Sequence, residues 1–391
     1  MTGRLPPADW TAREDLAALM AALGPANARY VGGAVRDTLL GIAVKDIDVA
    51  TVLRPETVIE RLDAAGIRSV PTGIEHGTVT AILPFGPVEI TTLRHDVSTD
   101  GRRATVAFAD DWREDAARRD FTINALYADP ASWEISDFFG GLADLAARRV
   151  RFIGDARQRI REDHLRILRY FRFQARFGSQ PADEEAESSC SDLAATLKGL
   201  SRERIGMEMT TLLGLPDPAP TVARMASLGV LGVILPEADP AALARLVGIE
   251  QAHGVAPDPV RRLAALLPAD TALAEQVASR FRLSGAQKKR LVLAAGRDGN
   301  PPDARALAYR IGTEGALDRL LLEGRSIAAL AGWAPPALPL KGGDIVARGV
   351  GAGPEVARVL RAVESRWIAE GFPESARVRA LLDEVLAGQA G

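Results

Sequence analysis

Residues 45–51 read Lys45-Asp46-Ile47-Asp48-Val49-Ala50-Thr51, and this stretch decides the fold around it. Polar and apolar residues alternate, which is typical of a β-strand with Ile47 and Val49 on one face and both aspartates on the other. Cα atoms two residues apart on a strand lie roughly 6.5 Å from each other. Two carboxylates at that spacing can bind one Mg²⁺ or bridge two ions about 3.5–4 Å apart. The stretch therefore predicts a strand that carries a metal site.

A glycine pair precedes the aspartates, in Gly32-Gly33-Ala34-Val35-Arg36-Asp37. It follows a predicted strand at Tyr30–Val31 and opens a predicted helix, so its backbone N–H groups, together with Arg36, favour a triphosphate. The pattern is neither Gly-x-Gly-x-x-Gly nor a Walker A loop, because no Gly-Lys-Ser/Thr occurs in the chain. A phosphate cradle close to metal-binding carboxylates predicts nucleotidyl transfer.

A third carboxylate, Glu89, lies in the alternating stretch Val88–Leu93 and could complete an all-oxygen site suited to Mg²⁺. Short β-branched stretches continue to about Asp144, and after Asp155 segments rich in Ala, Leu and Arg replace them. The expected strands are Tyr30–Val31, Ile47–Val49, Thr78–Leu83, Val88–Leu93 and Ala104–Ala107, and the expected helices include 12–23, 55–65, 155–177, 201–214, 219–229, 239–251, 257–267, 270–282, 285–296, 302–311, 315–331 and 353–370. The order predicts an α/β head followed by an all-α remainder.

The composition narrows the class of protein. The chain has 391 residues, 47% hydrophobic and 25% charged, so collagen-like and wholly disordered classes are excluded. It has no apolar stretch long enough for a membrane helix, and Met1–Leu16 lacks the pattern of a signal peptide. The single cysteine, Cys190, excludes an internal disulfide and fits a reducing compartment. We expect a cytoplasmic protein that contacts no membrane, and nothing implies a protein partner.

Positive charge is concentrated in one window. Residues 148–176 contain ten arginines against Asp155, Glu162 and Asp163, a net charge of +7, although the whole chain carries −3. Arginine has the planar donor fork that suits phosphates and base edges. This window predicts a helix that faces a nucleotide or a nucleic acid.

Five motifs together make a family resemblance. They are Gly32–Asp37 with Lys45–Thr51, Arg118–Leu126, Asp137–Leu145, Glu162–Arg169 and Ser201–Ile205, in order across residues 31–206. The chain resembles the class II tRNA nucleotidyltransferase and bacterial poly(A) polymerase family of the polymerase β superfamily. The resemblance implies an α+β fold: a polymerase β-like nucleotidyltransferase head with a mixed sheet and helices, then an elongated all-α neck, body and tail. The implied domains are a catalytic head at 1–145, a neck with a nucleotide-templating helix at 146–215, a body at 216–300 and a tRNA-contacting tail at 301–391.

Asp163 and Arg166 carry the expected choice of nucleotide. On one helix, residues i and i+3 are neighbours, so both side chains could address one flat base. Cytosine and adenine each present an amino donor beside a ring acceptor, which a carboxylate and a guanidinium match, whereas guanine and uracil present the reverse order. Each unpaired buried group costs about 1–3 kcal/mol, so this pair alone could reject G and U. The resemblance gives the pair the same role, with Arg169 and Arg172 assisting at base or phosphate.

The resemblance implies a reaction and its groups. Asp46 and Asp48 would hold two Mg²⁺ ions while the 3′-hydroxyl of tRNA attacks CTP or ATP and pyrophosphate leaves. Glu89 is the expected base or third ligand. The residues expected at the triphosphate and ribose are Gly32, Gly33, Arg36, Arg118, Arg119, Asp120 and Asn124. The expected partners are the 3′ end of tRNA and, through the tail, its elbow.

Close alternatives share these motifs. Between Asp48 and Glu89 the chain reads Val70–Thr80, which is similar to the CCA-adding branch and lacks the basic Arg-Arg-Phe segment of poly(A) polymerases. Addition of C, C and A to tRNA is therefore the expected function. An A-adding or C-adding specialist, a poly(A) polymerase and a non-catalytic RNA-binding relative remain alternatives. Lys288-Lys289-Arg290 is open to two interpretations, a contact with the tRNA backbone or a solvated helix face.

Overall fold

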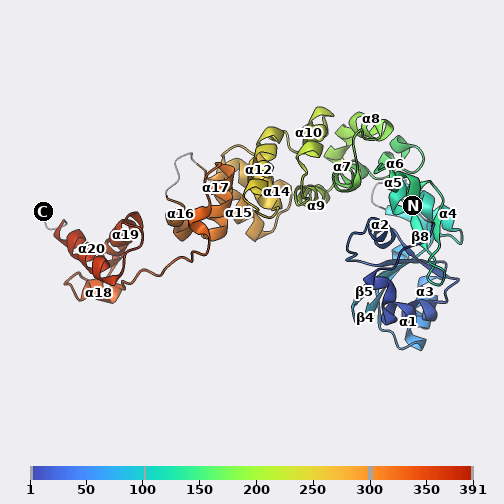
Figure 1. The fold of residues 1–391 in the computed structure, drawn as a ribbon, viewed down its shortest axis with the longest axis horizontal. Helices are drawn as coiled ribbons and strands as arrows, with labels where there is room; N and C mark the ends of the chain where they lie inside the picture. Colours follow the sequence, from blue (N-terminus) through green and yellow to red (C-terminus); the bar gives the residue numbers. More distant parts are fainter. Residues whose placement is uncertain (1–2, 101–102, 298–302, 389–391) are drawn as a thin grey trace. The chain divides into compact units, whose positions relative to one another are not determined.

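A computed structural model describes residues 3–100, 103–297 and 303–388, although not the side chains of residues 95–107. The chain folds into two compact units, Met1–Pro236 and Glu237–Gly391. The first begins with an α/β head, drawn in blue to green in Figure 1, and the rest of the chain is helical. This order of elements confirms the predicted α+β class.

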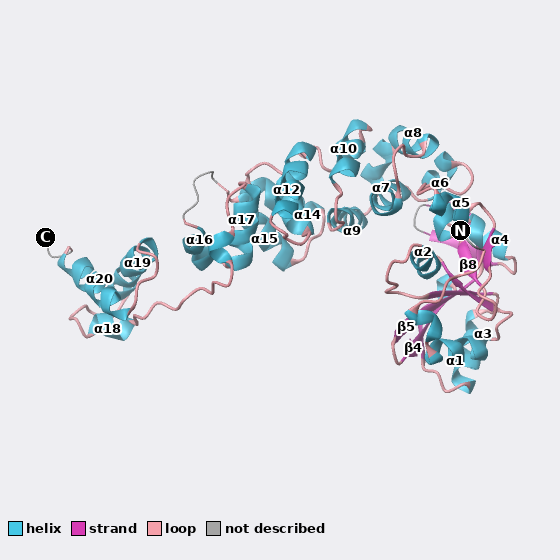
Figure 2. Cartoon of the chain, viewed as in Figure 1, coloured by secondary structure: helices cyan, strands magenta, loops and turns pink. Residues whose placement is uncertain are grey.

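A seven-stranded mixed sheet forms the head, in the order β3-β4-β5-β2-β1-β8-β9. The strands are β1 (Ala28–Val31), β2 (Asp48–Thr51), β3 (Ser69–Gly73), β4 (Thr78–Leu83), β5 (Gly86–Thr92), β8 (Leu126–Ala128) and β9 (Ile135–Asp137). Only the β2–β5 pair is parallel, and β6 (Arg94–Asp100) with β7 (Arg103–Phe108) makes a separate two-stranded ribbon. The sheet, magenta in Figure 2, puts β2 at its centre, so the aspartates of residues 46–48 lie beside buried strands.

Helices complete the head and form the rest of the first unit. In the head they are α1 (Glu14–Leu23), α2 (Gly33–Leu39), α3 (Pro55–Ala64), α4 (Trp112–Ala117) and α5 (Gly141–Ala146), with 3-10 turns at Asp9–Ala12, Ile74–His76 and Thr122–Asn124. After the head come α6 (Ala156–Glu162), α7 (Arg166–Phe177), α8 (Glu184–Asp192), α9 (Arg202–Leu213), α10 (Ala219–Ser227) and α11 (Val230–Ile234), with a 3-10 turn at Ala194–Gly199. Phe121 packs on Phe173 with ring centroids 5.0 Å apart, so α7 is joined to the head by an aromatic contact.

The predicted helix over 155–177 is wrong in one respect, because the chain leaves the helical conformation at Asp163. This residue has φ −149° and ψ 104°, and its Oδ1 accepts a hydrogen bond from the Leu165 N–H at 3.1 Å. A short acidic side chain that bonds to a nearby backbone group competes with helix continuation. Asp163 and Arg166 are therefore not neighbours on one helix: Asp163 ends α6, and Arg166 begins α7.

The second unit is helical throughout its described residues. Its helices are α12 (Pro240–Ala252), α13 (Pro259–Leu266), α14 (Thr271–Arg280), α15 (Gly285–Ala295), α16 (Ala304–Ile311), α17 (Thr313–Leu322), α18 (Gly342–Val346), α19 (Pro354–Ala369) and α20 (Ser375–Ala387), with a 3-10 turn at Ala328–Leu330. The predicted helices of this region are confirmed within a few residues, except that 315–331 is split, and α18 and α20 are additional. The division into neck, body and tail at residues 215 and 300 stays a prediction.

Both interpretations of Lys288-Lys289-Arg290 assumed that Arg290 faces solvent, but Arg290 is turned toward other helices. Its Nε lies 2.6 Å from Asp318 and its Nη1 lies 2.8 Å from Asp258. Asp318 is fully buried, and it also lies 3.3 Å from Arg261. Arg290 therefore joins α13, α15 and α17, and Lys288 of the same run pairs with Glu275 at 2.8 Å.

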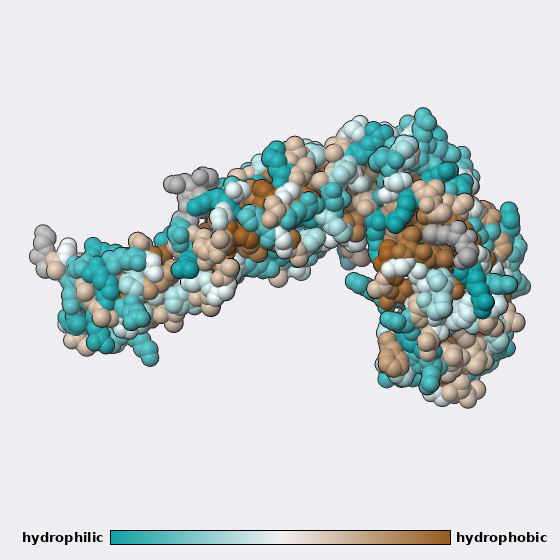
Figure 3. All heavy atoms as spheres, viewed as in Figure 1, coloured by the Kyte–Doolittle hydropathy of each residue, from teal (hydrophilic) through white to brown (hydrophobic). Residues whose placement is uncertain are grey.

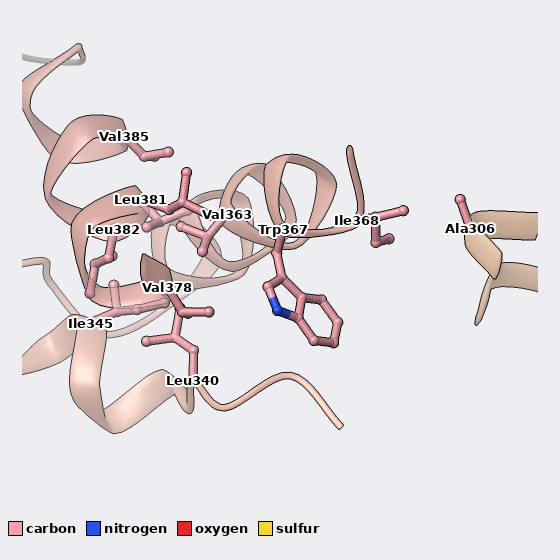
Figure 4. Close-up of a cluster of buried hydrophobic side chains, with 11 residues drawn as sticks. Ala306, Leu340, Ile345, Val363, Trp367, Ile368, Val378, Leu381, Leu382 and Val385 are labelled. Carbon is pink, nitrogen blue, oxygen red and sulfur yellow. The ribbon is translucent and has the colours of Figure 1, made fainter. Parts of the chain in front are cut away.

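A core of its own holds the end of the chain together. Figure 4 shows Trp367 of α19 among Val363, Val378 and Leu381, and Ala306 of α16 belongs to the same cluster. The indole N–H of Trp367 donates to the Pro373 carbonyl at 2.7 Å. Hydrophilic side chains, teal in Figure 3, are frequent on the visible face around this core. An apolar inside with a polar outside is what a stable helical module needs.

Gly141, in the predicted hinge motif, allows a close backbone approach. Asp137 binds the start of α5 through the N–H groups of Gly141 and Leu142, both at 2.9 Å. A Cβ atom on Gly141 would lie 2.2 Å from the Thr122 carbonyl oxygen, which is far inside van der Waals contact. The turn can therefore be made only by glycine.

We expect Gly141→Ala to lower the free energy of unfolding by roughly 2 kcal/mol or more, because backbone must move to admit the methyl group. Chemical denaturation measures it. The control is Gly248→Ala on α12, where a Cβ meets nothing within 4 Å and the better helix propensity should be neutral or stabilising. Equal stability of both variants would contradict the close approach.

Candidate active site

The predicted acidic residues meet where β2 begins. The strand starts at Asp48, so Asp46 precedes it, but burial still alternates: Ile47 and Val49 are buried and Asp46 is exposed. Asp48 lies opposite Val31 of β1 and opposite Glu89 of β5. The sheet thus places Glu89 beside Asp48, and Asp46 lies just before the start of β2, so the predicted metal site stays a prediction.

Negative charge at this point is poorly compensated. Burial raises the pKa of Asp48 above its ordinary value, the carboxylates of Glu89 and Asp46 raise it further, and Arg119 acts in the opposite direction. In the described part of the chain, no three His, Cys, Asp or Glu side chains are already gathered into a metal-binding cluster. Two aspartates with uncompensated charge and oxygen donors fit a divalent cation. Glu89 is the carboxylate directly opposite Asp48 in the sheet.

The glycine turn lies beside this acidic group. Gly32 has φ +69° and follows β1, and Gly33 opens α2, as predicted. A Cβ on Gly32 would lie 3.5 Å from Nη1 of Arg119. Arg119 is held by Tyr127 Oη at 3.0 Å and by Asp115 at 3.2 Å. Burial lowers its pKa, but these two partners outweigh burial and keep the guanidinium charged. Arg119 therefore places a positive charge next to Gly32 and Asp48.

Arg36 lies differently from the expectation of a free phosphate ligand. Its guanidinium donates to Asp37 at 2.8 Å and to the side-chain oxygen of Asn124. It also stacks over the ring of Phe177, with Cζ 4.2 Å from the centroid. Arg36 is 6% exposed, and burial lowers its pKa, which Asp37 opposes. In this arrangement Arg36 joins α2 to α7, and its charged group contacts protein groups instead of solvent.

Asp120 and Asn124 extend that connection. Asn124 donates to Asp120 at 2.9 Å, and Asp120 accepts from Arg169 of α7 at 2.6 and 2.8 Å. Burial raises the pKa of Asp120, but Arg169, Asn124 and a backbone N–H outweigh it and hold the pKa below its ordinary value. Asp37 closes the network on Arg176 at 3.2 Å. These residues couple the glycine turn to α7 through an unbroken chain of polar contacts.

Asp163 and Arg166 meet at the turn between α6 and α7. Asp163 Oδ2 accepts from Arg204 of α9 at 2.6 Å. Arg166 donates to Glu162 at 2.6 Å and to the backbone oxygens of Arg159 and Arg118 at 2.9 and 3.0 Å. Three of its five N–H groups are thus used, which leaves two for a ligand. Both side chains are held in place, and both keep hydrogen-bonding capacity for a base edge.

The remaining predicted residues support this site from further away. Arg118 donates to Asp115 at 2.8 Å, and Arg172 donates to Glu208 of α9 at 2.6 Å. Sequence reasoning did not single out Asp37, Asp115 or Glu208, which hold the arginines. Asp37 ends the motif Gly32–Asp37, and Asp115 lies four residues before Arg119, so proximity to these arginines is the signal that could have identified both. Glu208 gives no such signal.

The arrangement has two functional parts. One is an anionic centre, Asp46 and Asp48, with a positive charge and a glycine turn beside it. The other is a polar face at Asp163 and Arg166, which can test a base edge. The network from Arg36 to Arg169 links α2, the helix after the glycine turn, to α7, the helix that begins at Arg166.

Comparisons with known proteins agree with this chemistry. A family described as "Poly A polymerase head domain" matches residues 28–151, and one described as "Probable RNA and SrmB- binding site of polymerase A" matches residues 182–242. The mitochondrial CCA tRNA nucleotidyltransferase 1 of Mus musculus is 34% identical over 373 residues, 88% of this chain and 83% of the mouse protein. The CCA-adding enzyme of Streptococcus pyogenes is 44% identical over 194 residues, 49% of this chain and 46% of that enzyme.

Solved structures share the fold over nearly the whole chain. The Bacillus stearothermophilus CCA-adding enzyme in complex with CTP has a TM-score of 0.72 at 25% identity, covering 96% of this chain and 98% of that one. The Thermotoga maritima CCA-adding enzyme complexed with tRNA has a TM-score of 0.71 at 22% identity, with 96% and 95% covered, and at that identity it shows the fold alone. Among the helices of the described ranges, none combines the length and apolar composition that a membrane crossing requires.

Proposed function

The chain belongs to the family of CCA tRNA nucleotidyltransferases, and we propose that it adds C, C and A in turn to the 3′ end of tRNA from CTP and ATP. The observation that carries this proposal is the pairing of Asp46 and Asp48 with Gly32, Gly33 and Arg119 in the same unit as Asp163 and Arg166. An enzyme that transfers a phosphate group without choosing a nucleotide needs only the first group, the two aspartates with the glycine turn and Arg119. The second group is needed by an enzyme that must choose its nucleotides without a template.

Asp46 and Asp48 would hold divalent ions, and Mg²⁺ is the ion that all-oxygen ligands and phosphates favour. Bound there, Mg²⁺ lowers the pKa of the attacking 3′-hydroxyl and neutralises charge on the triphosphate. Support comes from the raised pKa of Asp48, which burial and the carboxylates of Glu89 and Asp46 cause although Arg119 opposes them. Glu89, next to Asp48 in the sheet, is the residue we propose as the base.

The phosphates are proposed to bind at Gly32 and Gly33, whose turn admits a close approach, with Arg119 as the cation. In-line transfer depends mainly on positioning and charge neutralisation, so held side chains matter more than reactive ones. Asp120 and Asn124 would face the ribose while they fix Arg36 and Arg169. Arg118 and Arg172 are each anchored by a carboxylate, and the same two carboxylates, Asp115 and Glu208, would also hold Arg119 and Arg169 in position.

Choice of base is proposed to rest on Asp163 and Arg166, with Arg169 and Arg172 nearby. Asp163 would accept from the amino group of cytosine or adenine, and Arg166 would donate to the adjacent ring nitrogen. The turn at residues 163–165 replaces the single helix that the sequence predicted, but the hydrogen bond from the Arg166 N–H to the Asp163 carbonyl, 2.9 Å, still keeps the two residues together.

We further propose that the head at 1–145 is catalytic, the neck at 146–215 selects the nucleotide, and the tail at 301–391, which follows a helical body at 216–300, holds the tRNA elbow by shape. Several charges on the described tail are used internally, since Arg358, Arg366 and Arg377 each pair with a glutamate. Recognition of RNA shape needs fewer free cations than binding through phosphates alone. A cytoplasmic location is also proposed, supported by the buried free thiol of Cys190.

End-labelled tRNA lacking CCA tests the function. It is incubated with the protein, Mg²⁺ and CTP, ATP or both, and products are separated at single-nucleotide resolution. We expect two additions with CTP alone and a third, with a stop, when ATP is also present. Addition of A alone to a CC-ended tRNA would identify an A-adding specialist, and a stop after CC with both nucleotides a C-adding one. A long ladder with ATP would identify a poly(A) polymerase, and binding without extension an RNA-binding relative.

A further inference from the structure

A pocket of about 660 Å³ lies on the head next to the acidic site and is not explained by the nucleotide-binding residues. Trp10, Arg13, the loop Gly41–Lys45 and Phe85 are among the residues that line it. Lys45 directly precedes Asp46, so the pocket begins one residue from the proposed metal ligands. The glycine turn is at the start of α2 and the pocket is at the end of α2, about 10 Å further along its seven residues.

Phe85 is unusual among the described residues. It is 73% exposed, the highest value of any large hydrophobic side chain in the described ranges, and it stands at the tip of the β4–β5 hairpin. Single exposed hydrophobic side chains are common on protein surfaces, but an exposed aromatic ring offers a flat face on which a nucleic-acid base can stack. No core requirement explains this one.

The ring is also held in place. The Arg13 guanidinium lies 5.5 Å from its centroid, and Arg13 is fixed by two hydrogen bonds to Asp15, at 2.8 and 3.0 Å. The backbone N–H of Phe85 points at the same carboxylate, at 3.4 Å. Because Arg13 is neutralised by Asp15, its part is to support the aromatic face. The result is a preformed flat apolar surface.

Lys45 adds a positive charge to the lining of the pocket. It is exposed, and no hydrogen bond or ion pair holds its ammonium group among the described side chains. A flat aromatic face and a nearby free ammonium group form the two elements that bind single-stranded nucleic acid: stacking for a base and charge for its phosphate.

We propose that this pocket holds an unpaired nucleotide at the 3′ end of the RNA, with its base stacked on Phe85 and a phosphate near Lys45. The inference rests on the proposed function, which requires a 3′-hydroxyl at Asp46 and Asp48. During CCA addition the terminal base changes at each step, so a fixed site for it has to accept different bases. Stacking meets this need because every base has a π-face, whereas Asp163 and Arg166 accept only one donor–acceptor order.

The test compares Phe85→Ala and Phe85→Trp with Ile82→Ala, an exposed apolar residue of the same hairpin that does not line the pocket. Substrates are tRNAs lacking CCA whose 3′-terminal nucleotide is either intact or abasic. We expect Phe85→Ala to raise the KM for intact tRNA about tenfold with the KM for CTP unchanged. Phe85→Trp and Ile82→Ala should stay within about twofold of the parent protein.

The abasic tRNA separates stacking from a structural effect. Removing the terminal base should weaken tRNA binding by the parent protein as much as Phe85→Ala weakens binding of intact tRNA. Phe85→Ala should then bind the abasic tRNA no more weakly than the parent protein does. A loss of the same factor on both substrates would overturn the proposal. Affinity for the two tRNAs is measured in parallel by fluorescence anisotropy without nucleotide. Equal affinity of Phe85→Ala and the parent protein for intact tRNA overturns the stacking proposal, whether or not the protein adds nucleotides. A failure of nucleotide addition alone contradicts the proposed function instead.

Discussion

Asp48→Asn is expected to lower the rate of nucleotide addition by roughly a thousandfold or more while the protein stays folded. Stabilisation of transition-state charge by a bound ion is worth several kcal/mol, and about 1.4 kcal/mol corresponds to a factor of ten in rate. Asp48 is the strand residue that brings Asp46 and Glu89 together, so its charge cannot be replaced locally. Single-turnover extension of tRNA with CTP measures the loss. The matched control is Asp63→Asn on the exposed face of α3, which should retain full activity.

The same variant should be at least as stable as the parent protein at neutral pH. Burial and the neighbouring carboxylates raise the pKa of Asp48 in the folded state. The folded protein then binds more protons than the unfolded chain between the unfolded and folded pKa values, so stability falls as pH rises through that interval and stays lower above it. Asparagine carries no charge and removes this cost. Thermal melting from about pH 4 to pH 7 measures the difference.

Divalent ions separate the two roles of this carboxylate. Mg²⁺ that binds only the folded state raises the melting temperature by mass action. We expect the parent protein to be stabilised by millimolar Mg²⁺ and Asp48→Asn to gain much less. An Asp48→Asn protein that keeps its rate would show that Asp48 does not serve the reaction. One that melts well below the parent would show that Asp48 serves the fold.

The head could be predicted because its signals are local. Alternation at residues 46–49 places β2, and the glycine pair places the turn before α2, so both follow from a few consecutive residues. The partner of β2 is not local: parallel pairing with β5 depends on a strand about forty residues further on. Alternation at Glu89 predicted the strand but not its neighbour in the sheet.

What sequence could not predict are contacts made across elements. Arg36 suits phosphate as a residue type, but its burial under Phe177 depends on how α7 packs on the head. Arg290 belongs to a basic run, yet Asp318 and Asp258 reach it from two other helices. Composition reports how many charges a segment carries, whereas the partner of each charge is set by tertiary packing. The break at Asp163 is intermediate, because a local side-chain bond causes it.

Asp163→Asn is expected to relax the choice of nucleotide while addition of C continues. An asparagine side chain can turn either its oxygen or its N–H₂ group to the base, so it can donate to O4 of uracil where aspartate can only accept. Each mismatched polar pair costs about 1–3 kcal/mol. Removing one mismatch should raise the ratio of kcat/KM for UTP to that for CTP by roughly ten- to a hundredfold. Steady-state kinetics with each nucleotide measures this ratio.

Arg204 provides the matched control, because it holds Asp163 without being placed to meet the base. Its Nη2 lies 2.6 Å from Asp163 Oδ2, and the Asp163 side chain is 28% exposed. Arg204→Met frees the carboxylate but keeps it an acceptor, so we expect slower addition with discrimination against UTP largely retained. Unchanged discrimination in Asp163→Asn would remove Asp163 from base selection. Equal relaxation in Arg204→Met would mean that selection depends on the rigidity of the turn between α6 and α7, and not on the order of donor and acceptor at residue 163.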